Sequence, residues 1–114
     1  MTLPVVTFED FQRVEMRVGR IIAAEPFPEA RKPAYKLRID FGPEIGIKQS
    51  SAQLTILYRC EDLIDQLVVG VVNFPPRRVA GFHSEVLVLG VADAEGAVVL
   101  LRPERDVPLG ARIF

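Results

Sequence analysis

The chain has 114 residues, of which 49% are apolar and 25% charged, a composition typical of one soluble globular domain. Its net charge of −1 argues against a protein whose main task is to hold phosphates, because such proteins usually carry a basic excess. Cys60 is the single cysteine, so no internal disulfide can form. The N-terminus lacks the pattern of a signal peptide, and the longest apolar run is too short to cross a membrane. These features favour a cytoplasmic protein without membrane insertion.

A short helix is expected near the N-terminus. Thr7 can cap the first turn, and Asp10, three residues on, can return a hydrogen bond to it, which is the pattern of a capping box. Phe8 and Phe11 fall on one face of this turn, so the turn must pack against something. Residues 1–13 are therefore interpreted as a helical extension before the first strand.

Alternating apolar and polar residues then predict a series of short strands. The first begins near Val14, and its alternation slips between Gly19 and Ile22, where a β-bulge is expected. The clearest alternation is at 35–41, where one face is apolar and the other charged.

The remaining pattern completes a small barrel. Further extended segments are expected at 45–54, 67–74, 85–91 and 97–103, with a short helix at 58–66. The segments 67–74 and 85–91 are apolar on both faces and are expected to be buried on both. This order predicts an all-β chain, a five-stranded Greek-key barrel of the OB-fold type, with short helices and a C-terminal extension at 97–114.

In such a barrel, ligands bind on the outer face of the second and third strands and between the neighbouring loops. The segment NFPPRRVAGFHSEVLVLG, at 73–90, is the most informative part of the chain. It places a Pro-Pro turn, two arginines and a Gly-Phe bend between two apolar strands, which would hold polar groups rigidly. The candidate binding residues are Tyr35, Lys36, Arg38, Lys48, Ser50, Asn73, Phe74, Arg77, Arg78, Phe82, Ser84 and Glu85.

Several of these candidates have two interpretations. Phe74 is expected in the core more than in a groove, because phenylalanine is usually buried. Phe82 follows a glycine in a loop, where exposure and burial are equally expected, and with Tyr35 it would give a groove an apolar floor. For Asn73, a structural role and a ligand-binding role remain open. Ser50 and its neighbour Ser51 could face a ligand, although one of them is expected to serve packing.

The chain shows no catalytic or metal-binding pattern. His83 is the only histidine, and no further histidine, cysteine or carboxylate pair stands at metal-ligand spacing. His83 and Ser84 are adjacent, so in a strand their side chains point to opposite faces. Phosphate-binding and dinucleotide-binding motifs are also missing from the sequence. No enzyme, no cofactor and no metal site are therefore predicted.

Three segments together resemble a known family: KPAYKLRIDFG at 32–42, KQSSAQ at 48–53 and RRVAGFHSEVLVLG at 77–90. With VEMRVGRIIAAEPFPEAR before them, they are similar to the tRNA-binding-domain superfamily, and within it to the CsaA family of secretion chaperones. The resemblance covers nearly the whole chain, from about Phe8 to Phe114. It implies an OB-fold homodimer without catalytic activity that binds unfolded or precursor polypeptides and works beside the export ATPase.

The same resemblance leaves tRNA binding as the alternative function. Relatives that bind tRNA have an asparagine after the fourth strand, basic residues in the next turn, and a Ser-Gln pair before the fifth strand. Asn73, Arg77, Arg78 and Ser84 match this arrangement, whereas Glu85 stands in place of the glutamine. A carboxylate at a rim that faces phosphates repels them and can only accept hydrogen bonds. The sequence therefore favours polypeptide over tRNA as the ligand.

Dimerisation has a second argument in the apolar pattern. The segment 85–91 is apolar on both faces, whereas a small barrel has only one interior. The other face needs a cover, from the terminal extensions of the same chain or from a partner subunit. Residues 1–13 and 97–114 are accordingly predicted at a dimer interface, with closure over their own barrel as the alternative.

Overall fold

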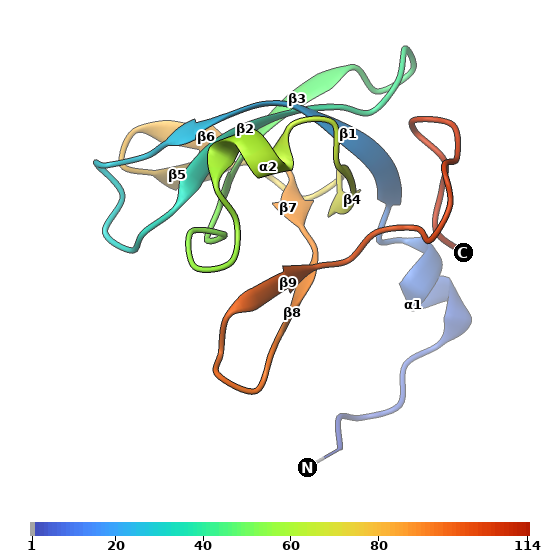
Figure 1. Cartoon of the computed structure of the whole chain (residues 1–114). Coiled ribbons are helices and arrows are strands. Elements are labelled where there is room, and N and C mark those ends of the chain that lie inside the picture. Colours follow the sequence, from blue (N-terminus) through green and yellow to red (C-terminus); the bar gives the residue numbers. More distant parts are fainter. Residues whose placement is uncertain (1) are drawn as a thin grey trace.

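The computed structural model describes residues 2–114, so Met1, the first residue of the predicted N-terminal extension, lies outside the described residues. The chain is mostly β, with short helices (Figure 1). Neither helix in the described part of the chain is long and apolar enough to span a bilayer. The elements are α1 (Phe8–Gln12), β1 (Met16–Pro26), β2 (Tyr35–Asp40), β3 (Ile47–Ala52), α2 (Cys60–Leu63), β4 (Leu67–Val71), β5 (Arg77–Val79), β6 (Phe82–Ser84), β7 (Leu87–Val88), β8 (Gly90–Ala92) and β9 (Val98–Leu100).

Five strands form a nearly closed antiparallel barrel. Their order in the sheet is β3-β2-β1-β4-β7, and α2 lies between β3 and β4 in the chain. The two ends of the sheet meet where β3 approaches residues 84–86: the N–H of Glu85 donates to the carbonyl of Gln49 at 2.9 Å. The predicted OB-fold is confirmed.

The long strand β1 bends and pairs with a different neighbouring strand at each of its ends. It pairs with β4 through its first residues and with β2 through its later ones, and its register shifts between Ile21 and Ala23. This shift is the predicted β-bulge, which lets one strand turn the corner of the barrel. Gly19 permits close packing nearby, because a Cβ atom there would lie 2.6 Å from Cγ2 of Ile39.

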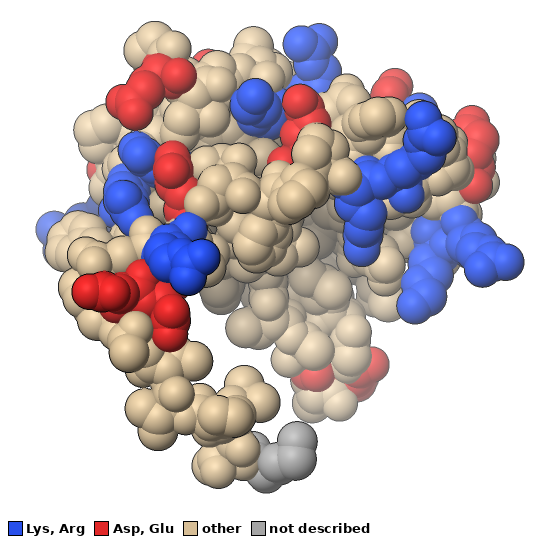
Figure 2. Space-filling view, turned by 180° about the vertical axis from the view of Figure 1, so that it is seen from behind, with Lys and Arg blue, Asp and Glu red and all other residues tan. Residues whose placement is uncertain are grey.

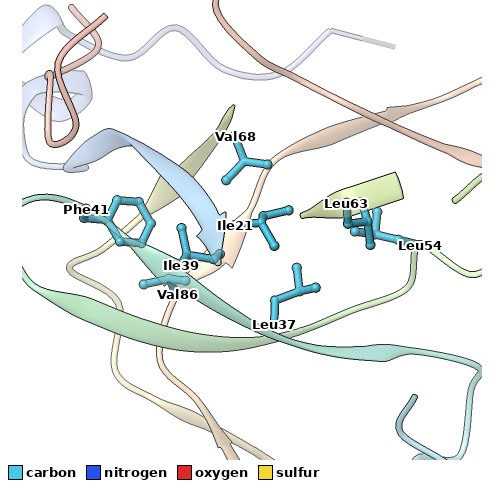
Figure 3. Packing of buried hydrophobic residues seen from close by; sticks show 8 residues of the cluster. All are labelled: Ile21, Leu37, Ile39, Phe41, Leu54, Leu63, Val68 and Val86. Atoms are coloured by element: carbon cyan, nitrogen blue, oxygen red, sulfur yellow. The ribbon is translucent and has the colours of Figure 1, made fainter. Parts of the chain in front are cut away.

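The interior of the barrel is apolar. In Figure 3 the side chains of its central cluster point toward one another from β1, β2, β4 and α2 and from the segments around them. Every residue of β4 is buried, as predicted for a strand with two apolar faces. The cluster consists of Ile21, Leu37, Ile39, Phe41, Leu54, Leu63, Val68 and Val86.

The segment 85–91 differs from its prediction. It breaks into β7, which pairs with β4 over two residues, and β8, which leaves the barrel to form a separate hairpin with β9. Leu87 and Val91 are 49% and 52% exposed, so the predicted burial on both faces is wrong within the single chain. The apolar face lacks a cover because the barrel wall has already closed when the chain reaches β8.

Helix α1 lies near the C-terminal residues of the chain (Figure 1). The predicted capping box is present: the N–H of Asp10 donates to Oγ1 of Thr7 at 3.2 Å, and the N–H of Thr7 donates to Oδ2 of Asp10 at 3.1 Å. None of the residues of α1 is buried within the chain. The C-terminal residues run beside β1, where Arg112 forms an antiparallel bridge with Arg17.

Candidate functional site

A groove of about 610 Å³ lies where the β1–β2 loop, the end of β3 and strand β5 meet. We call it the basic groove. In Figure 2, Lys and Arg side chains gather at the right, on the side of the molecule that carries this loop and the β5–β6 hairpin. The groove is lined by Glu29, Ala30, Arg31, Lys32, Ala34, Ser51, Gln53, Arg77, Arg78, Val79 and Ala80.

The fold brings two basic clusters of the sequence together in this groove. Arg31 and Lys32 come from the β1–β2 loop, and Arg77 and Arg78 come from β5, whereas Glu29 is the only carboxylate in the lining. The groove therefore has a local positive charge although the whole chain carries a net charge of −1. Such a site attracts carboxylates, phosphates and the negative ends of carbonyl dipoles.

A smaller pocket of about 210 Å³ adjoins the basic groove, because Ser51 and Arg77 line both. We call it the apolar pocket. Phe74 is 46% exposed and lines this pocket, so the expectation that it belongs to the core is wrong. The turn after β4 directs the ring outward, away from the filled interior. The other residues of the lining are Pro75, Ser84, Glu85, Val86 and Leu87.

An aromatic pair fixes the hairpin to the β1–β2 loop. The rings of Phe82 and Phe27 meet edge to face, with centroids 5.5 Å apart. Nζ of Lys36 lies 4.7 Å from the centroid of Phe27 and 5.4 Å from that of Phe82, a favourable cation–π arrangement. Phe82 is half-buried, is not part of the groove lining, and packs against Phe27 of the loop that borders the groove.

The register of β3 separates residues that were expected to act together. Lys36 and Arg38 lie on the outer face of β2, whereas Lys48 and Ser50 pair with core residues of that strand and lie on the inner face. The expectation that all four share one outer face is therefore wrong. The cause is the register of β3, which sets Ser50 opposite Leu37 and Lys48 opposite Ile39, and residues directly opposite each other share a face of the sheet.

Side chains close the barrel between β3 and residues 83–86, a junction that we call the seam. The N–H of Ser51 donates to Oγ of Ser84 at 3.0 Å, and the N–H of Gln49 donates to Oε1 of Glu85 at 3.0 Å. The hydroxyl of Ser50 donates to the carbonyl of Val86 at 2.8 Å. Ser50 and Ser84 are both buried. The two hydroxyls and the Glu85 carboxylate thus bond main-chain groups at this edge that have no main-chain partner across the seam.

Asn73 has a structural role in this chain. Its Oδ1 accepts from the N–H of Glu15 at 2.9 Å, and its Nδ2 donates to the carbonyl of Arg13 at 2.8 Å. Both bonds go to the link between α1 and β1. They join the start of segment 73–90 to the N-terminal extension.

Tyr35 also makes a structural contact. Its hydroxyl donates to the carbonyl of Tyr58 at 2.8 Å, and its ring packs against the core. Burial and the neighbouring negative charges around Cys60 raise the pKa of the Tyr35 phenol. The hydroxyl therefore stays protonated and keeps donating this bond at neutral pH.

The described residues offer little reactive chemistry. Among residues 2–114, no three His, Cys, Asp or Glu residues gather as metal ligands. Burial and the nearby Glu61 raise the pKa of the Cys60 thiol, which reduces its reactive thiolate form. His83 is exposed on β6.

Several residues that line the groove were not predicted from the sequence. Gln53, Val79 and Ala80 have no chemical signature, and their place in the lining follows from the path of the chain. One signal was available, since Ala80-Gly81 is a two-residue loop with glycine, which is typical of a tight hairpin.

The chain is similar in sequence to a known domain family and to part of several larger proteins. Residues 16–112 match the family described as "Putative tRNA binding domain". The Methionine--tRNA ligase of Thermococcus onnurineus is 38% identical over 108 residues, which are 95% of this chain and 14% of that protein. The corresponding ligase of Chloroherpeton thalassium is 35% identical over 107 residues, 94% of this chain and 15% of that protein. The chain thus spans a small part of the length of these relatives.

Solved structures match over full length. The chaperone CsaA from Bacillus anthracis str. Ames is 56% identical, with a TM-score of 0.91 and coverage of 97% of this chain and 100% of that one. The CsaA chaperone protein from Picrophilus torridus is 48% identical, with a TM-score of 0.90 and coverage of 96% and 100%. The chain therefore belongs to the CsaA family within the tRNA-binding-domain superfamily.

Proposed function

We propose that the protein is a chaperone without catalytic activity, which holds unfolded or precursor polypeptide in the basic groove and the apolar pocket. The observation that carries this proposal is the direct contact of the two sites, which share Ser51 and Arg77. The apolar pocket suits an apolar side chain of the client, and the cations suit its main-chain carbonyls and acidic side chains. The likeness to two CsaA chaperones supports the same function.

The site is suited to many clients. Main-chain and apolar contacts are available in almost any unfolded sequence, so a site built on them discriminates weakly. The barrel and the hairpin give these contacts stiff supports, which lowers the entropy lost when a flexible chain binds.

The alternative function is tRNA binding. It is favoured by the matching family and by the four cations of the basic groove. It is disfavoured by the net charge of −1 and by Glu85, whose carboxylate lines the adjoining pocket. A phosphate in the apolar pocket would meet this carboxylate with a like charge.

Salt dependence separates the two functions. We expect binding of a fluorescently labelled, permanently unfolded polypeptide to change only a few-fold between about 50 and about 200 mM salt. Phosphate contacts to the four cations of the groove would lose about a hundredfold in affinity over the same range. Fluorescence anisotropy with this polypeptide and with tRNA measures both. Binding of tRNA alone would refute the chaperone proposal.

A pair of variants places the ligand in the groove. Lys32→Ala removes a cation from the lining, and Arg105→Ala removes a cation that is exposed elsewhere. Lys32→Ala should weaken polypeptide binding several-fold, and Arg105→Ala should leave it unchanged. Equal effects would show that general charge, and not this groove, governs binding.

The proposal also includes a homodimer. Phe8 and Phe114 are 67% and 100% exposed, and the terminal extensions leave a pocket of about 190 Å³ between α1 and the C-terminus. A second copy would cover these apolar residues and would place two grooves on one particle, which raises avidity for a long client. A cytoplasmic location and work beside the export ATPase belong to this proposal through the family resemblance.

A further inference from the structure

The β5–β6 hairpin has one strand with a free edge. Its loop has two residues, Ala80 and Gly81, with φ of 46° and 81°, the left-handed backbone of a type I′ turn. In such a hairpin the residues flanking the loop, Val79 and Phe82, form a hydrogen-bonded pair. The next pair, in which Arg78 lies opposite His83, is a non-hydrogen-bonded pair. The N–H and C=O of Arg78 therefore point away from β6.

The edge of β5 on that side is unpaired. β5 pairs with β6 and with no other strand of residues 2–114. No main-chain hydrogen bond joins Arg78 to another segment of this part of the chain. One donor and one acceptor of the main chain are thus available to a ligand.

The basic groove follows this edge. Its lining includes the four consecutive residues 77–80 and none of the residues of β6. Successive side chains of a strand point to opposite faces, so a groove on one face would contact every second residue. Contact with four residues in a row is expected when the groove runs along the edge of the strand.

We propose that an extended client segment binds as an additional β-strand on the free edge of β5, with hydrogen bonds to the N–H and C=O of Arg78. This inference rests on the proposed polypeptide-binding function and specifies how the client is held. Main-chain bonds of this kind do not depend on the client's side chains. The surrounding cations suit the carbonyl oxygens and any carboxylate of such a strand.

The charge of the edge also argues against pairing between two copies of this chain. A second β5 in this position would bring Arg77 and Arg78 of both copies together, and like charges on facing edges oppose pairing. A neutral or acidic segment meets no such repulsion. Charge repulsion therefore opposes pairing of this edge with a second copy and does not oppose pairing with a neutral or acidic client segment.

Two variants at one position test the hydrogen bond on the protein side. Arg78→Ala and Arg78→Pro both remove the guanidinium group, but only Arg78→Pro removes the N–H. The hairpin should accept proline here, because proline is tolerated where a strand's N–H faces outward. The probe is a labelled seven-residue peptide of alternating threonine and valine that ends in a glutamate. Arg78→Pro should bind it about five- to tenfold more weakly than Arg78→Ala. Equal affinities would overturn the proposal.

A series of N-methylated probe peptides tests it with the unchanged protein, so a misfolded variant cannot decide the result. A strand offers only alternate N–H groups to one edge. Because Arg78 offers a single carbonyl acceptor, single N-methylation should weaken binding about five- to tenfold at the position whose N–H donates to it, and should spare the two neighbouring positions, whose N–H groups point away. Uniform loss, or no loss, would overturn strand addition while leaving polypeptide binding intact. Failure of the unmethylated peptide and of longer unfolded chains to bind would refute the proposed function and this inference together.

Discussion

At the scale of single residues, Ala80 has a backbone conformation that alanine rarely adopts. Its φ of 46° costs a residue with a Cβ atom about 1–2 kcal/mol, and asparagine is preferred at this place in a type I′ turn. Ala80→Asn should raise the free energy of unfolding by about 0.5–1 kcal/mol. Urea unfolding measures the change, with Ala94→Asn in the β8–β9 turn as the control, where φ is not positive. A fall in stability with Ala80→Asn would contradict the assigned turn.

At the scale of elements, the seam determines whether the barrel closes. Ser84→Ala removes the acceptor for the N–H of Ser51 and should lower the free energy of unfolding by about 1 kcal/mol, because this part-buried donor would lose its partner. Ser51→Ala is the matched control, since the Ser51 side chain has no hydrogen bond to another residue of 2–114. Hydrogen exchange should also quicken at the Ser51 amide in Ser84→Ala. Equal stability of the two variants would show that this bond contributes nothing to closure.

The individual strands differ in how well their burial could be predicted from the sequence. β2 alternates cleanly between apolar and charged residues, and β4 is apolar throughout, so both were predicted with their burial. In β3 the small residues Ser50 and Ser51 fit either face, and the pattern could not decide the register. β5 and β6 have three residues each, too few for a period to appear. The fold was thus predictable from long periodic segments, whereas the faces and edges that form the site were not.

The basic groove was less predictable for a further reason. Arg31 and Arg77 are far apart in the sequence and meet because the β1–β2 loop bends toward the hairpin, where Phe27 contacts Phe82. No local pattern encodes this contact. Only the tertiary structure shows that the basic residues of the loop and of β5 line one groove.

At the scale of the whole molecule, the terminal extensions determine the proposed assembly. The stacked rings of Phe8 and Phe11 have centroids 6.3 Å apart, and neither residue is buried within the described chain. Sedimentation at micromolar concentration should give the mass of a dimer. The double variant Phe8→Ser with Phe11→Ser should give a monomer, whereas Ile56→Ser, on an exposed apolar residue between β3 and α2, should remain a dimer. A monomeric native protein would remove both the dimer and the avidity argument.

Heat or a bulky ligand first separates the two neighbouring strands that are joined by the fewest main-chain hydrogen bonds. In this barrel those bonds are fewest at the seam, where side chains supply most of the hydrogen bonds. Ser51 belongs to the seam and also to both cavities, so local separation there would widen the binding site while β1, β2 and β4 stay intact. The same few hydrogen bonds at the seam would then explain both why the barrel is weakest there and why the site accepts large client side chains. Strengthening this junction should yield a sturdier protein with a narrower range of clients.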